Sequence, residues 1–600
     1  MDLLPKVFRT EGNIAEFDPT KIFESILKET GMKETEAKKI TELVVRRIIS
    51  SGIKFLSGPH IREIVCSILS EQHFESERKL YTRIGMPLMD YETILEKGPI
   101  DSLNKQINPE KIHHWAGNQI AEEYAHLRIL KDEESKAHLS GDIHINDLNY
   151  FVLRPFSQIW DARIILKYGF PPLKNLKGYY FNKPAKDLNS ALSQLNKWIG
   201  IIQNEFYGTQ GFYFFNNFLA PYLQDLPEEI IIRIIQNYIY ENNQMPLTIG
   251  REIKQASVYT SNSIFNGIFE IPAIGPYGNI KNVYGNYQKE SKLLLKALIV
   301  AFKNAYKNYH PNSLPKHYIL MDNKFIDIIE EIYPNFWNEI DLICSSYFMN
   351  YNLDSYRNKN FKSILNEKYH NFGILQNISL NLPRYAFISR NEDNFFELLH
   401  SYLNLCSNIL IKKYEIIKKR IDSNKLPLCS GIIDDDQLFK LENQGISISI
   451  VGLNEAVKFL TNYHLHEHLE AAKFGNKVLY KINKLCSELS GKYHKLIILS
   501  ENISETAINR FTKLDLKQFP MQFKAISNNQ KYTNSVHFHK NAQIDLLERI
   551  KIQGDFHKFI HYGAISYISF NDLKRNDMNI RDFIRKMIEE LRISSLKFYS

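Results

Sequence analysis

The chain has 600 residues, of which 44% are hydrophobic and 24% charged, a composition typical of folded proteins that argues against intrinsic disorder. Its 75 basic and 67 acidic residues are interspersed, so the formal net charge of +8 gives little support to a dedicated nucleic-acid surface. Five cysteines without a CxxC pair argue against a disulfide framework or a cysteine zinc site, and no metal is predicted. No run approaches the about 20 apolar residues of a membrane helix, so we expect two folded units in the cytoplasm.

The first 92 residues are predicted to form a hairpin followed by a small helical bundle. Apolar and polar residues alternate over 6–17 around Glu11-Gly12-Asn13, which indicates two short strands and a glycine turn. Asp18 before Pro19 predicts a helix start, with apolar residues at helical spacing up to Gly31. Further amphipathic helices are expected at 35–50, 59–70 and 74–90.

A connector and a second, larger unit follow. Over 93–108 the apolar periodicity lapses into a stretch containing Gly, Pro and Asn, which predicts a linker. Beyond it, amphipathic helices alternate with β-rich runs such as ISISIVGL (446–453) and TNSVHF (533–538). This alternation predicts an α/β domain over 109–600.

Three short patterns stand out in the first unit: Val7-x-Arg9-x-x-Gly12, Phe17-Asp18-x-x-Lys21-Ile22 and Tyr81-x-Arg83. They resemble the ATP-cone found at the front of many ribonucleotide reductases, a switch that senses ATP against dATP. The resemblance implies that ATP or dATP is the allosteric ligand, bound by Arg9, Gly12, Lys21 and Arg83. Arginine and lysine pair with phosphates, and a glycine turn lets the backbone approach them.

The first unit departs from the cone pattern at two positions. Thr10 follows Arg9 where the family usually has a second basic residue, and Cys66 replaces a glutamate common in the third helix. The alternative interpretation is a small helical domain whose charges are only solvated.

Ten stretches in the second unit keep the order of one enzyme family. They are GDIHINDL (141–148), RPFSQIWDAR (154–163), QGFYFFNNFLAPYL (210–223), IYENNQM (239–245), IPAIGP (271–276), ISLNLPR (378–384), VGLNEAVK (451–458), ISETAINRF (503–511), YTNSVHF (532–538) and GDFHKF (554–559). Together they resemble the anaerobic (class III) ribonucleoside-triphosphate reductases, which convert NTP to dNTP by radical chemistry and so supply deoxyribonucleotides for DNA replication.

The resemblance implies a ten-stranded α/β barrel of the ribonucleotide reductase and glycyl radical type, with a catalytic loop inside it. The residues expected to line or support its substrate pocket are His144, Asp147, Ser157, Asn216, Asn381 and Asn534. The alternative for the histidine and the aspartate is a loop hydrogen bond, and for the asparagines the capping of turns. His464, His466 and His468 alternate in NYHLHEH, but the family has Leu-His-Glu there, so we assign no metal site to them.

The groups on which the family's radical chemistry depends are missing from the sequence. Reduction begins when a thiyl radical abstracts the 3′ hydrogen of the ribose, and a second thiol serves the reduction of the 2′ carbon. Ser157 stands where the family has one of these cysteines, and no cysteine occurs between Tyr347 and Arg384, where it has the other. A serine cannot replace a cysteine, because an alcohol O–H bond is too strong. The chain also reaches Ser600 without the four-cysteine zinc site or the arginine-x-x-glycine-tyrosine pattern of the glycyl radical loop.

Three functions remain open on the sequence alone. The first is a catalytically degenerate nucleotide-binding protein that regulates or pairs with an active reductase. The second is a divergent or split active reductase, with its glycyl radical subunit on a separate chain and Cys344 as a displaced radical thiol. The third, a nucleic-acid-binding protein, has only the net charge in its favour. The expected partners are nucleoside triphosphates, a second copy in a homodimer, and a separate radical subunit or active reductase.

Overall fold

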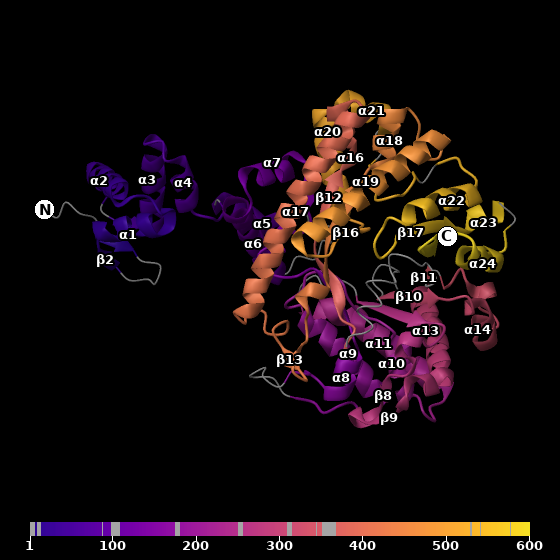
Figure 1. The fold of residues 1–600 in the computed structure, drawn as a ribbon. Helices are drawn as coiled ribbons and strands as arrows, with labels where there is room; N and C mark the ends of the chain where they lie inside the picture. Colours follow the sequence, from indigo (N-terminus) through magenta and orange to yellow (C-terminus); the bar gives the residue numbers. More distant parts are fainter. Residues whose placement is uncertain are drawn as a thin grey trace. The chain divides into compact units, whose positions relative to one another are not determined.

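The computed structural model describes residues 6–8, 14–53, 55–86, 88–97, 109–173, 181–249, 256–308, 315–343, 345–350, 368–527, 531–539, 542–575 and 578–599. The chain divides into two compact units, Met1–Asp132 and Glu133–Ser600, and each is taken by itself (Figure 1). Among the described helices, none combines the length and the apolar composition needed to cross a membrane.

The first unit is a small sheet followed by a helical bundle. Strands β1 (Lys6–Phe8) and β2 (Ile14–Glu16) pair antiparallel, which confirms the predicted hairpin, and β3 (Phe55–Ser57) pairs parallel with β1. Helix α1 (Pro19–Thr30) begins after Asp18, whose carboxylate accepts from the backbone N–H of Thr20 at 3.0 Å, and ends at Gly31. The next helices are α2 (Glu34–Ser50), α3 (Gly58–Glu71), α4 (Glu75–Tyr81), α5 (Leu88–Lys97) and α6 (Pro109–Tyr124).

Helix boundaries near the predicted linker differ from the sequence expectation. The helix expected at 74–90 is divided into α4 and α5, because Gly85 and Pro87 interrupt the helical pattern. Helix α5 continues to Lys97, into the expected connector. Residues 98–108 lie outside the described part of the chain, so the linker at 93–108 and the domain bounds on either side of it stay predictions.

The second unit is built around a ring of ten strands in two parallel halves. The first half contains β5 (Ser157–Trp160), β6 (Gln210–Phe212), β7 (Ser257–Ser261), β10 (Lys316–Met321) and β11 (Ser346–Asn350). The second contains β12 (Phe372–Asn381), β15 (Gln444–Val451), β16 (Ile497–Leu499), β17 (Ile565–Ser569) and β18 (Ser595–Tyr599).

The two halves join into a closed barrel. β12 pairs antiparallel with β5, and β11 pairs antiparallel with β18. A parallel bridge between Ser500 and His561, next to β16 and β17, closes the second half. The short β4 (Ile143–Ile145) adds antiparallel to β12 on the side of β5. This arrangement confirms the predicted α/β fold with a ten-stranded barrel.

Helices connect the parallel strands and cover the barrel, as parallel strands require (Figure 1). The longer ones are α9 (Leu188–Ile202), α11 (Glu228–Ile249), α13 (Gln288–Asn308), α17 (Glu392–Asp422), α19 (Leu469–Tyr493), α20 (Glu505–Gln518), α22 (Leu546–His557) and α24 (Ile580–Glu589). Shorter ones include α7 (Asp132–Ser140), α8 (Arg163–Tyr168), α10 (Phe215–Leu219), α14 (Phe325–Ile332), α16 (Leu382–Ser389), α18 (Leu453–Thr461), α21 (Pro520–Ser527) and α23 (Phe570–Arg575). One apolar core contains Ile319, Phe348, Leu596 and Phe598 of the strands, packed with residues of α13, α14 and α24.

Of the two β-rich runs singled out in the sequence, one is a strand. ISISIVGL coincides with β15, which is buried along its whole length. TNSVHF is not a strand: it makes a single bridge, between Asn534 and Val451, and Ser535 has a φ of +49°. A positive φ is incompatible with an extended ladder, so the pairing stops after one bridge.

Candidate functional site

A cavity of about 220 Å³ lies in the first unit between the sheet and the first turns of α1 and α3. The residues that line it are Val7, Glu16, Phe17, Asp18, Lys21, Ile22, Ser25, Gly58, Ile61, Arg62 and Tyr81. The N-termini of two helices therefore border one cavity, and the positive end of a helix dipole favours an anion. Lys21 and Arg62 add two cations, against the carboxylates of Glu16 and Asp18.

The predicted nucleotide-binding residues have different positions around this cavity. Lys21 lines it, whereas Arg83 is described and exposed and is not among the lining residues. Arg9 and Gly12 lie outside the described residues. The sequence analysis missed Arg62. This residue is the fifth of α3, and its place beside the cavity follows only from the packing of α1 against α3.

In the barrel, Ser157 is half-buried and lies on the inner face of β5. Trp160 of the same strand packs against Trp198 of α9 on the outside, with ring centroids 5.2 Å apart, and side chains alternate along a strand. Ser157 is opposite Ile374 of β12, and Ile374 is opposite Gly445 of β15. The face of β15 that carries Gly445 therefore also points inward.

A buried polar network covers this part of the inner wall. The side-chain amide of Asn377, on β12, donates to the Ser447 hydroxyl at 2.6 Å. The side-chain oxygen of the same amide accepts from the Ser449 hydroxyl at 2.9 Å and from the Asn502 amide at 3.0 Å. Asn146 donates to the same oxygen at 2.7 Å. The side chains of this network are thus amides and hydroxyls, which bind polar ligands.

The opposite inner wall carries a row of stacked aromatic rings. Tyr318 of β10 lies between Tyr259 of β7 and Tyr347 of β11, with centroid distances of 4.5 and 4.7 Å. Tyr213, just after β6, extends the row at 5.1 Å from Tyr259. Lys597 of β18 completes it, because its ammonium group lies 4.2 Å from the Tyr347 ring centroid and donates to its hydroxyl at 2.9 Å.

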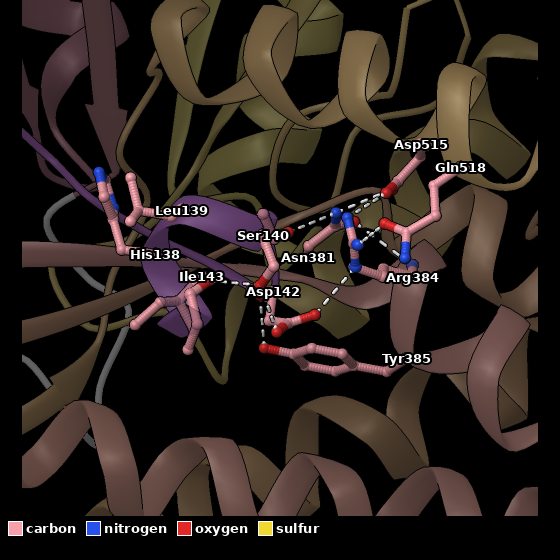
Figure 2. A network of polar contacts seen from close by, with 12 residues as sticks. His138, Leu139, Ser140, Asp142, Ile143, Asn381, Arg384, Tyr385, Asp515 and Gln518 are labelled. Atoms are coloured by element: carbon pink, nitrogen blue, oxygen red, sulfur yellow. Dashed lines mark hydrogen bonds and ion pairs between the residues drawn. The ribbon is translucent and has the colours of Figure 1, made fainter. Parts of the chain in front are cut away.

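The Gly141-Asp142 turn is held to α16 and α20 by a buried ionic network (Figure 2). Arg384 is 2% exposed and pairs with Asp142 at 2.9 Å and with Asp515 at 2.7 Å. Asn381 caps α16 and donates to Asp515 at 2.8 Å and to the Gly141 carbonyl at 2.9 Å. Burial raises the pKa of Asp515 to about 6, although Arg384 acts in the opposite direction.

His144 and Asp147 follow this turn. His144 lies on β4, opposite Ser379 of β12, and stacks on His138 at a centroid distance of 5.4 Å. Burial, and secondarily Arg510, lowers its pKa to about 3, so the ring is neutral at physiological pH. Asp147 has a φ of +47° and starts a short 3₁₀ turn, Leu148–Tyr150. The pocket roles of both residues stay predictions.

Asn216 and Asn534 differ in how their amides are used. Asn216 is fully buried, donates to the Ser261 carbonyl at 2.9 Å and accepts from the Ser261 N–H at 3.0 Å, which ties α10 to β7. The side-chain atoms of Asn534 are buried and have no hydrogen-bond partner within the described chain. An unpaired buried polar group is costly, and among the predicted pocket residues His144 likewise has a buried Nδ1 without a hydrogen-bond partner in the described chain. The pocket roles of Asn216 and Asn534 stay predictions.

Two of the three histidines of the NYHLHEH run have hydrogen-bond partners, whereas the Nδ1 of His466 is buried and has none among the described residues. His464 contacts the side-chain amide of Asn454 at 3.0 Å, and His468 caps α19. His464 also lies near His539, which pairs with Glu455 at 2.9 Å. These contacts hold the segment after α18 to the segment that follows Asn534.

The described cysteines of the second unit are buried. Cys406 and Cys486 lie on α17 and α19, and Cys429 precedes the short hairpin β13 (Ile432–Ile433) to β14 (Asp436–Gln437). Burial raises the pKa of the Cys486 thiol to about 12, so it is not a thiolate at neutral pH. Cys344 lies outside the described residues.

Comparison with known proteins agrees with this architecture. The family model described as "Anaerobic ribonucleoside-triphosphate reductase" matches residues 101–599. The anaerobic ribonucleoside-triphosphate reductase of Haemophilus influenzae is 21% identical over 96% of this chain and 88% of its own length. The enzyme of Enterobacteria phage T4 is 23% identical over 81% of this chain and 84% of its own.

Solved structures of Thermotoga maritima anaerobic ribonucleotide reductase share the fold at 18% identity. The structure with glycerol in the active site has a TM-score of 0.68 and covers 85% of each chain. The complex with dATP and CTP has a TM-score of 0.65 and covers 85% of this chain and 88% of that chain.

A closed barrel of two five-stranded parallel halves, with Ser157 on its inner wall, places the second unit in the ribonucleotide reductase class of α/β barrels. The family match over 101–599 makes the assignment specific. This chain belongs to the anaerobic ribonucleoside-triphosphate reductase family, whose reaction is the conversion of NTP to dNTP.

Proposed function

We propose that this chain is a nucleotide-binding member of the family that has lost the radical reaction and that regulates or pairs with an active reductase. The observation that carries the proposal is Ser157. It occupies the inner wall of the barrel at the position of a family cysteine, and no cysteine occurs between residues 345 and 405 to supply the other thiol. Without a thiol, no thiyl radical can form to accept the 3′ hydrogen of the ribose.

The decisive test is a search for product. The purified chain is incubated with ribonucleoside triphosphates, an activating enzyme and a reductant under anaerobic conditions, and deoxyribonucleotides are measured by chromatography. We expect none, while an active family member assayed in parallel forms them. The Ser157→Cys variant is expected to remain inactive, because it restores only one of the two thiols. Product formation by the unmodified chain would contradict the proposal.

We also propose that the cavity of the first unit is the nucleotide site, in keeping with the cone resemblance. Its two helix N-termini and Lys21 suit a triphosphate, and a relative of the barrel is known in complex with dATP and CTP. Calorimetric titration of ATP and dATP into the intact chain tests this. Binding is expected, and the Lys21→Gln variant should bind at least about tenfold more weakly, because it loses a charge-assisted contact.

Family membership keeps an active enzyme as the second candidate. In that case a separate chain carries the glycyl radical and a thiol outside the family position, such as Cys344, acts in the body. Adding a radical-bearing subunit should then produce deoxyribonucleotides, and Cys344→Ser should abolish them. If no deoxyribonucleotide forms either with the activating enzyme alone or with the added radical-bearing subunit, the active-enzyme candidate is excluded and the catalytically degenerate protein remains.

A further inference from the structure

The guanidinium of Arg62 is fixed in one orientation by the first unit. Its Nη1 and Nη2 donate to the two carboxylate oxygens of Glu29 at 2.7 and 2.8 Å, and Nη1 also donates to the Tyr81 carbonyl at 2.6 Å. The group lies over the Tyr81 ring, 4.3 Å from its centroid. Glu29 and Tyr81 are themselves linked through Ser25, whose hydroxyl is 2.9 Å from each of them.

This anchoring uses only the end of the guanidinium. Arginine has five N–H donors, and the three bonds to Glu29 and Tyr81 use both hydrogens of Nη1 and one of Nη2. Among the residues that the structure describes, no acceptor is present for Nε–H and the second Nη2–H. These two donors form the lateral edge of the guanidinium, where they point in parallel and match two oxygens of one phosphate.

Arg62 lines the cavity that also contains Lys21 and the first turns of α1 and α3. We propose that Arg62 is a bidentate phosphate ligand in this cavity and that Glu29 is the positioning residue that presents its lateral edge. This inference rests on the proposed nucleotide site and assigns to it a residue that the cone resemblance does not.

The charge distribution of the cavity is consistent with this role. The Asp18 carboxylate caps α1, where it accepts hydrogen bonds from the backbone N–H and the hydroxyl of Thr20. Its hydrogen bonds are therefore made within α1 and not to Arg62. Glu29 is not among the lining residues. A phosphate can therefore approach Arg62 without displacing Glu29. Because the Arg62 side chain is already ordered by Glu29 and Tyr81, the entropy cost of ordering it does not fall on ligand binding.

The test separates the contribution of the Arg62 guanidinium's two parallel donors to ATP affinity from the contribution of its positive charge. ATP is titrated calorimetrically into the full chain and into Arg62→Lys, Arg62→Gln, Lys21→Gln and Arg47→Gln. Arg47 is the matched control, because it makes the same two-oxygen pair with Glu71, at 2.7 and 2.8 Å, but does not line the cavity. We expect both Arg62 variants to raise the Kd about 10- to 100-fold and Arg47→Gln to leave it unchanged.

The possible results separate this inference from the proposed function. An unchanged Kd in Arg62→Gln overturns the inference, and so does an unchanged Kd in Arg62→Lys, since lysine keeps the charge and loses the two parallel donors. If Lys21→Gln alone weakens binding, the nucleotide site stands without Arg62. If the unmodified chain does not bind ATP, the proposed nucleotide site itself fails. A partly unfolded variant lowers the number of binding sites rather than their Kd, so misfolding is recognised in the same titration.

Glu29→Gln provides an independent check. It removes no group from the cavity wall, but it loosens the anchor of Arg62. We expect weaker ATP binding than in the unmodified chain, with the loss smaller than in Arg62→Gln. Unchanged or tighter binding would contradict the positioning role.

Discussion

Arg384 shows why single buried residues decide the integrity of the barrel site. Its guanidinium lies between the carboxylates of Asp142 and Asp515, on segments far apart in the chain. Arg384 and Asp515 are almost inaccessible to water, and the Asp142 side chain is 14% exposed. Water cannot compensate a charge left unpaired in such surroundings, whereas an exposed ion pair exchanges its partners for water at little cost.

We therefore expect Arg384→Met to lower the free energy of unfolding by about 3–5 kcal/mol, since two carboxylates lose their buried partner. Urea denaturation followed by circular dichroism measures the change. Arg47→Met is the control, as its pair with Glu71 is exposed and its loss should hardly move the midpoint. Equal effects of the two substitutions would show that the Arg384 network does not hold the barrel together.

The neutral His144 predicts acid sensitivity with a defined sign. Its folded pKa, about 3, is below the ordinary value near 6.5, so between these values the unfolded chain binds a proton that the folded chain does not. The contribution of the neutral His144 to the free energy of unfolding is fully present above about pH 6.5. It decreases by about 1.4 kcal/mol per pH unit as the pH falls from 6.5 toward 3.

The measurement is the free energy of unfolding of the unmodified chain and of His144→Gln between pH 7 and pH 4. Between pH 7 and pH 4, the unmodified chain should lose about 3 kcal/mol more of its free energy of unfolding than His144→Gln loses. His400→Gln, at an exposed position on α17, serves as the control and should show no such shift. A constant difference across the range would mean that His144 is accessible to protons in the folded protein.

At the scale of elements, α17 is tied to the loop that leads into β5. Lys413, fully buried in the middle of this helix, donates to the carbonyls of Tyr150 and Phe151 at 3.1 and 2.7 Å, and to that of Arg154 at 2.5 Å. Three carbonyls of one loop therefore converge on one ammonium group. This contact fixes the start of β5, and with it the position of Ser157.

Lys413→Met keeps most of the side-chain volume but removes the ammonium donor from the carbonyls of Phe151 and Arg154, while the Tyr150 carbonyl still accepts from the backbone N–H groups of Leu153 and Arg154. We expect a loss of about 3 kcal/mol in the free energy of unfolding, because buried acceptors lose their hydrogen bonds. Amide hydrogen exchange should accelerate at residues 150–154 in particular. Lys418→Met, five residues further along α17 and exposed, is the matched control and should change neither quantity.

At the scale of the whole molecule, the two compact units predict separate responses to a ligand. If the cavity of the first unit binds ATP, as proposed, the nucleotide stabilises the folded form of that unit alone. The barrel unit has its own core and should be unaffected.

Calorimetric unfolding with ATP at about 100 times its Kd should stabilise one transition by about 2.7 kcal/mol and leave the other in place. At the same ATP concentration Lys21→Gln should reduce this stabilisation to about 1.4 kcal/mol or less, because a Kd at least tenfold higher leaves ATP at no more than about 10 times the Kd, and it should not move the transitions measured in the absence of ATP. A shift of both transitions would indicate a second nucleotide site in the barrel, near the unpaired amide of Asn534, and a shift of the barrel transition alone would contradict the assignment to the first unit.

The sequence by itself determined the family and those elements that follow from local patterns. The alternation around Gly12, the cap at Asp18 and the run of 446–453 specify a hairpin, a helix and a strand through local rules of spacing and backbone conformation. The substitution at Ser157 was also readable, because it lies within a stretch that keeps the family order.

Only the tertiary structure decided which side chains meet. Arg62 faces Glu29 across α1 and α3, and Arg384 lies between Asp142 and Asp515, contacts that join positions 33, 242 and 131 residues apart. TNSVHF looked like a strand because its composition is β-rich, yet the left-handed Ser535 ends its pairing after one bridge. Local propensity is set by neighbours in sequence, whereas the bonding of a buried charge depends on neighbours in space, and these are fixed only when the helices pack on the barrel.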